Sequence, residues 1–421
     1  IAANSSSLPE VVGNPSALFD PNDTAAMTEL MERSLGDQEF RQELCESAAL
    51  QVEKFSWWRT AERTLTALER LFQVRPAITP HSETLRLLPE RIVNTLSQEH
   101  CQVAVNEVAQ CLANNFADRD SKPQFLLDVT ELRLADSKTG IQRVVRSLLL
   151  TFLRRPPEGF SVGAIYYDKG RFRYATQFLA NFAGLTPGDD EVVDFRSGDI
   201  YLSLDFTIRT APRAEAFLKA LSRRRVRICF VLYDLLPVLR PEWWPEGTSV
   251  RHEMWLRSLT AVADTVCCIS KTVAQEFSEW LDELGLTSQQ EKPAVQWFHL
   301  GGDIARSAPS SGMPVGYRQT TDAMANGQSF LMVGTLEPRK GHEQVLAGFE
   351  LLWERDLSLN LVIVGKRGWM LEDFIARLES HRELGKRLFW LDAVSDECLE
   401  DLYRRSTCVL AASEGEGFGL P

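Results

Sequence analysis

This sequence lacks the spacing patterns of several common functional sites. Its eight cysteines form no C-x-x-C pair and its six histidines form no H-x-x-x-H pair, so the usual zinc spacings are absent. No G-x-G-x-x-G follows an expected strand, which argues against an NAD-dependent dehydrogenase. No apolar run reaches the roughly 18 residues that a membrane helix needs. The sequence therefore predicts buried free thiols in a reducing compartment, with no metal and no cofactor.

Positive charge is also scarce. The 421 residues carry 46 basic and 58 acidic side chains, a net charge of -12 at pH 7. Binding along a phosphate backbone needs a basic face, so nucleic acid is excluded as a main partner. One basic cluster, Arg223-Arg224-Arg225-Val226-Arg227, either complements the dipole at a helix end or docks on anionic lipid. With 44% hydrophobic residues, the composition is that of a globular protein long enough for two or three domains.

What the sequence does have is a regular alternation of strands and helices. In the first run, expected strands cover 125–129, 162–167, 200–204, 226–233 and 266–269, with a helix over 141–153. In the second run, expected strands cover 329–334, 359–364 and 388–391, with helices over 341–353 and 395–404. Strands that are apolar almost throughout are typical of parallel sheets covered on both faces. The pattern predicts an α/β protein with two Rossmann-like β/α/β domains.

Residues 1–75 read as the end of a domain. A short strand and a serine-rich turn are followed by a helix that Asp23 or Thr24 could cap. A later helix carries Trp57 and Trp58, which are expected to anchor it by packing.

Two stretches read as connections. Residues 76–123 contain Pro76, Pro80 and Pro89 between weakly periodic segments, which favours a helical linker. Residues 301–327 are rich in Gly, Ser, Pro and polar side chains, which favours a linker between two domains.

The most informative motif lies at the end of the sequence. The apolar run 407–412 resembles a buried strand and breaks into a segment with Glu416, Gly417, Phe418 and Gly419. Ligands bind at such carboxyl ends in doubly wound domains, where glycine amides approach an anion or a sugar and a carboxylate accepts sugar hydroxyls. The spacing alone fits a surface turn equally well.

A second motif follows the expected strand 329–334. Gly334 and Thr335 begin a turn in which Arg339 and Lys340 stand side by side, and a helix is expected from about Gly341. A helix N-terminus beside two cations forms an anion site. The alternative is a turn whose cations face only solvent.

Both motifs resemble those of the family-four retaining glycosyltransferases. The segment 416–421, Glu-Gly-Phe-Gly-Leu-Pro, is similar to the start of the family signature Glu-Gly-Phe-Gly-Leu-Pro-x-x-Glu. The segment 334–341 resembles the family's diphosphate-binding loop, Gly-Arg-x-x-x-x-Lys-Gly. Thr335 stands where the first arginine of that loop is common, so Arg339 is expected to supply the second charge.

This resemblance implies the GT-B architecture, in which two Rossmann-like domains face a cleft. Residues 124–300 would form the acceptor-side domain and residues 301–421 the nucleotide-sugar donor domain, incomplete at its C-terminal end. Residues 1–75 would be the C-terminal end of a donor domain, with 76–123 as the linker.

The resemblance also implies roles for the motif residues. Lys340 and Arg339 would stabilise the leaving diphosphate, and Glu416 would hold hydroxyls of the sugar. Donor-binding residues would be Gly334, Thr335, Gly341, Gly417, Phe418, Gly419 and Gly140. Because cationic side chains neutralise the diphosphate, no metal would be required, and the family offers no dependable general base.

Weaker matches lie in the first run. The segment 138–144 resembles the family's glycine loop, in which Gly140 allows close backbone approach and Arg143 is either a cleft or a surface residue. The segment 231–237 resembles His-Asp-Leu-x-Pro, with Tyr233 in place of the histidine. The carboxylates of Asp234 and Asp205 are the acceptor-side candidates. Ser270 is expected to cap a helix.

The two ends of the sequence suggest a fragment. The second glutamate of the signature would fall beyond Pro421, and residues 1–13 resemble the segment that normally follows the signature. A tandem protein accounts for this order, with a circular permutation as the alternative. We expect Ile1–Ala3 to lie beside Val409–Ala411, because apolar surface seldom stays bare. The helix with Trp57 and Trp58 should then pack near the cleft.

The resemblance implies a retaining glycosyltransferase of bacterial surface-polysaccharide synthesis. The donor would be a GDP- or UDP-linked sugar, and the Gly-Thr-x-Glu-Pro-Arg-Lys variety of the loop suggests mannose. The acceptor would be a glycan or a lipid-linked glycan. The expected location is the cytoplasm, with peripheral contact at the inner membrane. The alternatives are a nucleotide-sugar 2-epimerase of the same architecture and a catalytically degenerate glycan-binding domain.

Overall fold

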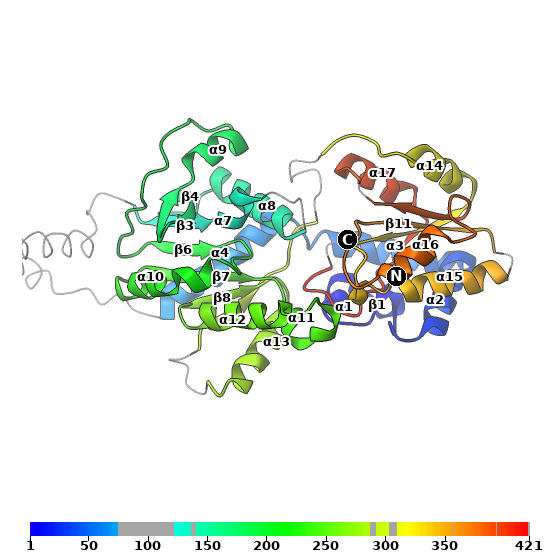
Figure 1. Ribbon diagram of the computed structural model, residues 1–421, viewed down its shortest axis with the longest axis horizontal. Coiled ribbons are helices and arrows are strands. Elements are labelled where there is room, and N and C mark those ends of the chain that lie inside the picture. The colour runs from blue at the N-terminus through cyan, green and yellow to red at the C-terminus, as the bar shows by residue number, and fades with distance from the viewer. Residues whose placement is uncertain are drawn as a thin grey trace, which may run out of the picture.

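The computed structural model describes residues 1–74, 122–135, 140–286, 292–302, 310–355, 357–392 and 394–419. Two lobes lie side by side along the long axis of the molecule (Figure 1). The first lobe comprises residues 122–302, and the second lobe comprises residues 310–419 together with residues 1–52. Almost all of the linker predicted over 76–123 falls outside the described residues.

The first lobe is built on a seven-stranded sheet. Its strands are β3 (Gln124–Asp128), β4 (Ser161–Asp168), β5 (Arg171–Tyr174), β6 (Ile200–Ser203), β7 (Arg227–Leu232), β8 (Thr265–Cys268) and β9 (Ala294–Trp297). They lie in the order β5-β4-β3-β6-β7-β8-β9. Only β5 runs antiparallel to its neighbour, because it returns from β4 through a hairpin at Lys169 and Gly170.

Helices cover both faces of this sheet, as its apolar strands require. They are α7 (Thr130–Leu134), α8 (Gly140–Arg154), α9 (Thr176–Ala183), α10 (Ala211–Arg223), α11 (Leu236–Leu239), η2 (Pro241–Trp243), α12 (Thr248–Thr260) and α13 (Lys271–Glu283). On one face α8 buries Val144, Leu148 and Phe152 against the sheet. On the other face α10 and α12 bury residues such as Leu218 and Trp255.

The second lobe holds a parallel sheet in the order β12-β11-β10-β13. The strands are β10 (Gln328–Val333), β11 (Leu359–Val364), β12 (Leu388–Leu391) and β13 (Cys408–Val409). The helical elements are α14 (Tyr317–Asn326), η4 (Pro338–Lys340), α15 (His342–Glu354), α16 (Glu372–Glu379) and α17 (Asp396–Arg405). The predicted architecture of two Rossmann-like units facing a cleft is confirmed.

The interpretation of 301–327 as a linker is wrong over its second half. Residues 317–326 form α14, which buries Thr320, Thr321 and Met324. The buried positions are mostly threonines, so the helix has few of the apolar residues by which a packed face is recognised. Residues 303–309 lie outside the described part of the chain.

The N-terminal residues complete the second lobe. Their elements are β1 (Ala2–Ala3), α1 (Leu8–Val12), η1 (Pro15–Ala17), β2 (Leu18–Phe19), α2 (Thr24–Gly36) and α3 (Gln38–Val52). The amide of Ala3 donates to the carbonyl of Ala411 at 2.7 Å, and the N-terminal ammonium of Ile1 donates to the carbonyl of Val409 at 2.9 Å. Parallel pairing of Ala2 with Ala411 continues the sheet past β13. The expected placement of Ile1–Ala3 beside Val409–Ala411 is confirmed.

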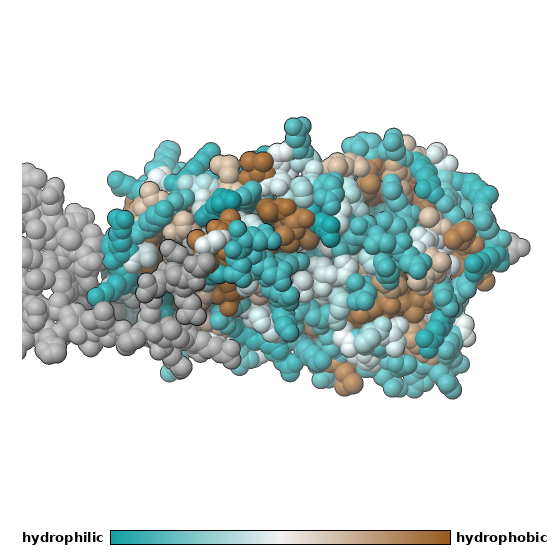
Figure 2. All heavy atoms as spheres, turned by 90° about the horizontal axis from the view of Figure 1, so that it is seen from below, coloured by the Kyte–Doolittle hydropathy of each residue, from teal (hydrophilic) through white to brown (hydrophobic). Residues whose placement is uncertain are grey.

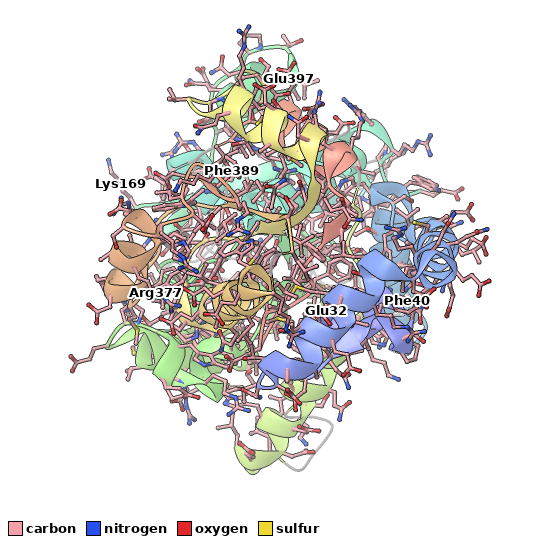
Figure 3. All side chains as sticks on the ribbon, turned by 90° about the vertical axis from the view of Figure 1, so that its right-hand side faces the viewer. Glu32, Phe40, Lys169, Arg377, Phe389 and Glu397 are labelled. Carbon is pink, nitrogen blue, oxygen red and sulfur yellow. The ribbon has the colours of Figure 1, made fainter. Side chains whose placement is uncertain are left out.

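Helix α2 packs against α15 and so joins the N-terminal residues to the helices of the second lobe. A Cβ atom on Gly348 of α15 would lie only 3.0 Å from Cε of Met27 on α2, so the two helices approach closely. Glu32 of α2 forms an ion pair with Arg355 just beyond α15. In Figure 3, Glu32 on α2 and Arg377 on α16 lie on either side of α15. The predicted cap is also present, since Asp23 accepts a hydrogen bond from the amide of Ala26 at 2.9 Å.

Helix α4 (Trp57–Val74) leaves the second lobe and packs on the first. The hydroxyl of Thr60 donates to the carbonyl of His299 at 2.8 Å, beyond the end of β9. Trp57 is buried, as expected of a residue that anchors the helix by packing, and it also lines the cavity between the lobes. Trp58 is not an interior anchor, because it is 42% exposed, with the guanidinium of Arg155 over its ring at 4.2 Å from the centroid.

We expect Gly301→Ala to destabilise the docking of α4. A Cβ atom on Gly301 would lie closer than 3.0 Å to the backbone nitrogen of Trp57. Because the neighbouring atom belongs to the backbone, no side-chain rotation could relieve this clash. Overpacking of this kind costs about 1–3 kcal/mol of unfolding free energy. Thermal and urea unfolding should show the loss, whereas the matched control Gly302→Ala meets no atom within 4 Å. Equal melting temperatures for the two variants would contradict this packing.

The surface view in Figure 2 is mostly hydrophilic, and its hydrophobic side chains form separate patches. Within the described ranges, we find no helix that combines the length and the apolar character of a membrane span.

Candidate active site between the two lobes

A cavity of about 600 Å³ lies between the lobes. The first lobe contributes Gly140, Arg143 and Asp234 to its walls, and the second lobe contributes residues that follow β10 and β13. The carboxyl ends of parallel strands therefore face this cavity, which is where ligands bind in doubly wound folds.

The turn after β10 depends on glycine. Gly334 ends the strand with φ 155°, and a Cβ atom on Gly365 would clash with its carbonyl oxygen. Gly341 has φ 74° and lies against the carbonyl of Ala412, so a side chain there would be both strained and obstructed. Between these glycines, the short helix η4 turns Arg339 and Lys340 toward the residues after β13.

Four charged side chains meet at this turn. Nζ of Lys340 forms an ion pair with one oxygen of Glu416, and a guanidinium nitrogen of Arg339 lies 3.1 Å from the other oxygen. A second guanidinium nitrogen of Arg339 lies 2.7 Å from Glu337. The hydroxyl of Ser413 donates to Glu416 at 2.7 Å. Two cations and two carboxylates thus neutralise each other inside the cavity wall.

Burial and the neighbouring charges shift the pKa values of three side chains in this cluster. Burial by itself would raise the pKa of Glu416, but the charges of Lys340 and Arg339 outweigh it and hold the pKa at about 2. For Glu337 burial prevails and raises the pKa, although Arg339 and Lys340 oppose the change. Burial acts to lower the pKa of Arg339, but Glu416 and Glu337 reverse that effect and raise it. Glu416 is therefore ionised at neutral pH.

The side chain of Lys340 is buried, although no local feature of the sequence indicates burial. Lys340 and Glu416 are each only 7% exposed. The sequence shows Lys340 in a polar turn, and the contact that buries it comes from a segment 76 residues away.

The glycine-rich segment after β13 touches both lobes. A Cβ atom on Gly417 would clash with the carbonyl of Tyr233, and the carbonyl of Gly417 accepts a hydrogen bond from Ser270 at 2.7 Å. The ring of Phe418 packs edge-on against Phe55, with centroids 5.6 Å apart. This segment, which lines the cavity through residues 416–419, is held by contacts rather than left as a free turn.

Most of the candidate residues from the sequence line the cavity. On the second lobe they are Gly334, Thr335, Arg339, Lys340, Glu416, Gly417, Phe418 and Gly419. On the first lobe they are Gly140 and Asp234. Arg143 also lines it and forms an ion pair with Asp396 of α17. That pair ties the two lobes together.

The structure does not bring two candidates to the cavity. Asp205 is buried behind it, where it accepts hydrogen bonds from the amides of Leu132 and Phe206, and burial raises its pKa to about 7. Gly341 stands outside the wall and serves the backbone turn. Tyr233 contributes to the wall, but its hydroxyl donates to the carbonyl of Leu204 at 2.6 Å.

The sequence did not identify Glu337, Trp57 or Tyr403 as residues of the site, although all three line the cavity. For Glu337 a signal was available, because Pro338 separates it from Arg339 and an acid and a base two positions apart can pair across a turn. The wall positions of Trp57 and Tyr403 come from helices distant in sequence, and no local pattern marks them.

Comparisons with known proteins agree on one class. A family model described as "Glycosyl transferases group 1" matches residues 318–421. An Escherichia coli protein named "Serotype-specific mannosyltransferase WbdA" is 39% identical over 431 residues, covering 100% of this chain and 52% of that protein. "O-antigen chain mannosyltransferase B" from Escherichia coli is 38% identical over 95 residues, 22% of this chain and 24% of that protein. The chain spans about half the length of the curated relatives that match it throughout.

Among solved structures, "Trehalose-6-phosphate from E. coli bound with UDP-2-fluoro glucose" aligns with a TM-score of 0.44 at 15% identity, over 70% of this chain and 79% of that one. Anabaena Alr3699/HepE in complex with UDP and glucose aligns with a TM-score of 0.42 at 15% identity, over 70% of this chain and 76% of that one.

Proposed function

From the premise that this chain belongs to the glycosyl transferases group 1 family, we propose that its cleft binds a nucleotide sugar and transfers the sugar to a glycan with retention of configuration. The observation that carries the proposal is the pairing of Arg339 and Lys340 with Glu416 in the wall of the interlobe cavity. Two cations and a carboxylate at one spot match the two halves of a nucleotide sugar, its diphosphate and its hydroxyls.

The charge cluster can perform the electrostatic part of the reaction. Cleavage of the sugar–phosphate bond passes through an oxocarbenium-like state while negative charge gathers on the departing diphosphate. Lys340 and Arg339 would stabilise that charge, and the N-terminus of α15, directly after η4, adds a favourable dipole. As the cations turn to the diphosphate, Glu416 is released to accept hydroxyl groups of the sugar. No residue is assigned as a general base, and the proton of the acceptor hydroxyl would pass to an oxygen of the departing diphosphate.

The proposed identities of the donor sugar and of the acceptor come from the names of the similar proteins. Because the relatives that cover this chain are named mannosyltransferases, mannose from GDP-mannose is the proposed donor, and a polysaccharide chain of the bacterial surface is the proposed acceptor. Contact with the inner membrane would follow if that acceptor is lipid-linked.

The test is transfer by the full-length protein. We expect GDP-mannose to yield GDP and a manno-oligosaccharide one unit longer by mass spectrometry, with UDP-glucose as the matched donor control. EDTA is expected to leave the rate unchanged, since Lys340 and Arg339 supply the neutralising charge. An epimerised donor, or donor binding without turnover, would replace this proposal by the 2-epimerase or the degenerate glycan-binding domain.

A further inference from the structure

A second cavity, of about 480 Å³, lies where the N-terminal residues meet the segment after α11. Asn4, Asp20 and Asn22 form one side, and Arg240 and Trp243 face them from the first lobe. The volume falls within the range of about 300–1,000 Å³ that is usual for small-molecule sites. None of these residues takes part in the charge cluster of the cleft.

The wall between the two cavities is the segment 414–416. Glu414 lines the second cavity, and Glu416 lines the cleft. Gly415 between them packs against Trp243, since a Cβ atom there would lie 2.7 Å from the indole ring. The carbonyl of Gly415 accepts a hydrogen bond from Arg339 at 2.7 Å. The two cavities are thus neighbours that share one short stretch of backbone.

The second cavity offers both donors and acceptors. The side-chain amides of Asn4 and Asn22 are exposed and make no hydrogen bond with the described residues. One oxygen of Glu414 accepts from Gln344 at 3.1 Å, and within the described chain its other oxygen accepts none. Hydroxyl groups can use all of these positions, because a hydroxyl both donates and accepts.

An aromatic face accompanies these polar groups. Trp243 is half-buried, and Arg240 lies over its ring at 5.7 Å from the centroid. The carbonyl of Trp243 accepts a hydrogen bond from the indole of Trp369 at 2.9 Å, which anchors this segment to the second lobe. A fixed indole provides apolar contact area at low entropic cost.

The charge and polarity of the lining residues limit which class of ligand the second cavity can bind. Three carboxylates, those of Asp20, Glu242 and Glu414, line the cavity beside a single guanidinium, that of Arg240. This balance repels phosphate groups and nucleotides. The polar walls give no burial to a lipid chain. A neutral ligand with many hydroxyls and a C–H face that can lie on an indole fits both observations, and this is the chemistry of a saccharide.

We propose that the second cavity binds part of a glycan chain, at sugar units away from the reacting end. The inference rests on the proposed function for its ligand class, since a glycosyltransferase must hold a glycan acceptor. The reacting end belongs in the cleft with Glu416, and the segment 414–416 separates it from the second cavity. A chain held at both places stays bound through units that do not react.

The test is oligosaccharide binding by a double variant, Asn22→Ala with Glu242→Ala. Both side chains are exposed, and the ion pair of Glu242 with Arg240 is long at 3.9 Å, so the fold should tolerate the change. Calorimetry on the full-length protein, with a linear mannotetraose and no donor, should show affinity about tenfold lower than in the parent, as expected for two lost hydrogen bonds. Affinity for GDP should stay unchanged.

The matched control is Asn181→Ala with Glu246→Ala, which removes the same groups from exposed positions outside both cavities. It should bind mannotetraose like the parent. Equal affinities for the two double variants would overturn the proposal. A parent protein that does not bind mannotetraose would also overturn it. The same holds if GDP-mannose abolishes mannotetraose binding, because the oligosaccharide would then occupy the cleft.

Turnover of GDP-mannose in the same samples separates the two proposals. One outcome is that turnover is absent while the variant Asn22→Ala with Glu242→Ala loses oligosaccharide affinity and the control variant does not. In that case the proposed function fails and the glycan site stands. If turnover is present and oligosaccharide affinity does not depend on the second cavity, the further inference fails by itself.

Discussion

Lys340→Ala is expected to lower kcat/KM for the nucleotide sugar by about a hundredfold or more. A cation that meets charge developing on a leaving group acts mainly in the transition state, and removing one such group commonly costs about 10²–10³ in rate. Steady-state kinetics with GDP-mannose should show the loss in kcat as well as in affinity. Lys219→Ala is the matched control, because Lys219 is a surface residue of α10 that pairs with Glu215 outside the cleft. An unchanged kcat/KM would contradict the assignment of Lys340.

The same substitution should also lower the free energy of unfolding. It removes one of the two cations that neutralise the buried Glu416. Breaking a buried pair costs about 3–5 kcal/mol when no partner remains, and the cost should be smaller here because Arg339 stays in place. Adding Glu416→Gln should restore much of the stability and none of the activity. A double variant that regains turnover would show that Lys340 serves only as a structural counter-ion.

Glu416→Gln by itself is expected to reduce turnover by about a hundredfold while nucleotide affinity is kept or increases. The neutral amide cannot accept sugar hydroxyls as a carboxylate does, an effect on the scale of one lost charge-assisted contact in the transition state. It also no longer competes with a diphosphate for Lys340 and Arg339. Calorimetry with GDP and kinetics with GDP-mannose would separate the effects, with the exposed Glu343→Gln as control. If GDP affinity collapses, Glu416 belongs to nucleotide binding instead.

The pH dependence of stability gives an independent check on Glu416. Its pKa is lowered from 4.5 to about 2 in the folded protein, so it binds fewer protons than in the unfolded chain. The stability that it contributes is complete above pH 4.5 and is lost as the pH falls toward 2. Urea unfolding at pH 7 and pH 3 should therefore show the difference between parent and Glu416→Gln shrinking at the lower pH. A difference that grows would contradict the lowered pKa.

The fold was predictable where apolar residues run without interruption. The strand β11 was expected at 359–364 and occupies Leu359–Val364, because the apolar run 361–364 marks it despite the polar Asn360. The strand β9 was missed, since Ala294–Trp297 is short and only partly buried. The hairpin into β5 was also missed, although Lys169 and Gly170 with positive φ are the kind of pair that a tight turn needs.

The candidate site was predictable in its local motifs and not in its long-range contacts. The loop with Arg339 and Lys340 carries its own signature of a strand end, two cations and a glycine. That Glu416 neutralises both cations depends on how β10 and β13 lie next to each other in the sheet, which no local pattern specifies. Asp205 failed as a candidate for the same reason, because a carboxylate at a strand end can turn inward to backbone amides as well as outward.

The pairing of Ile1 with Val409 has a consequence for the order in which the lobes form. These residues are 408 positions apart, whereas the first-lobe strands β3 to β9 all come from residues 124–297. Contacts between distant residues slow folding, because the entropy of closing the loop is lost before the contacts form. The first lobe should therefore acquire hydrogen-exchange protection early in refolding. In the second lobe β10 to β13 also come from one stretch, residues 328–409, so protection should come last at β1, when it docks beside β13.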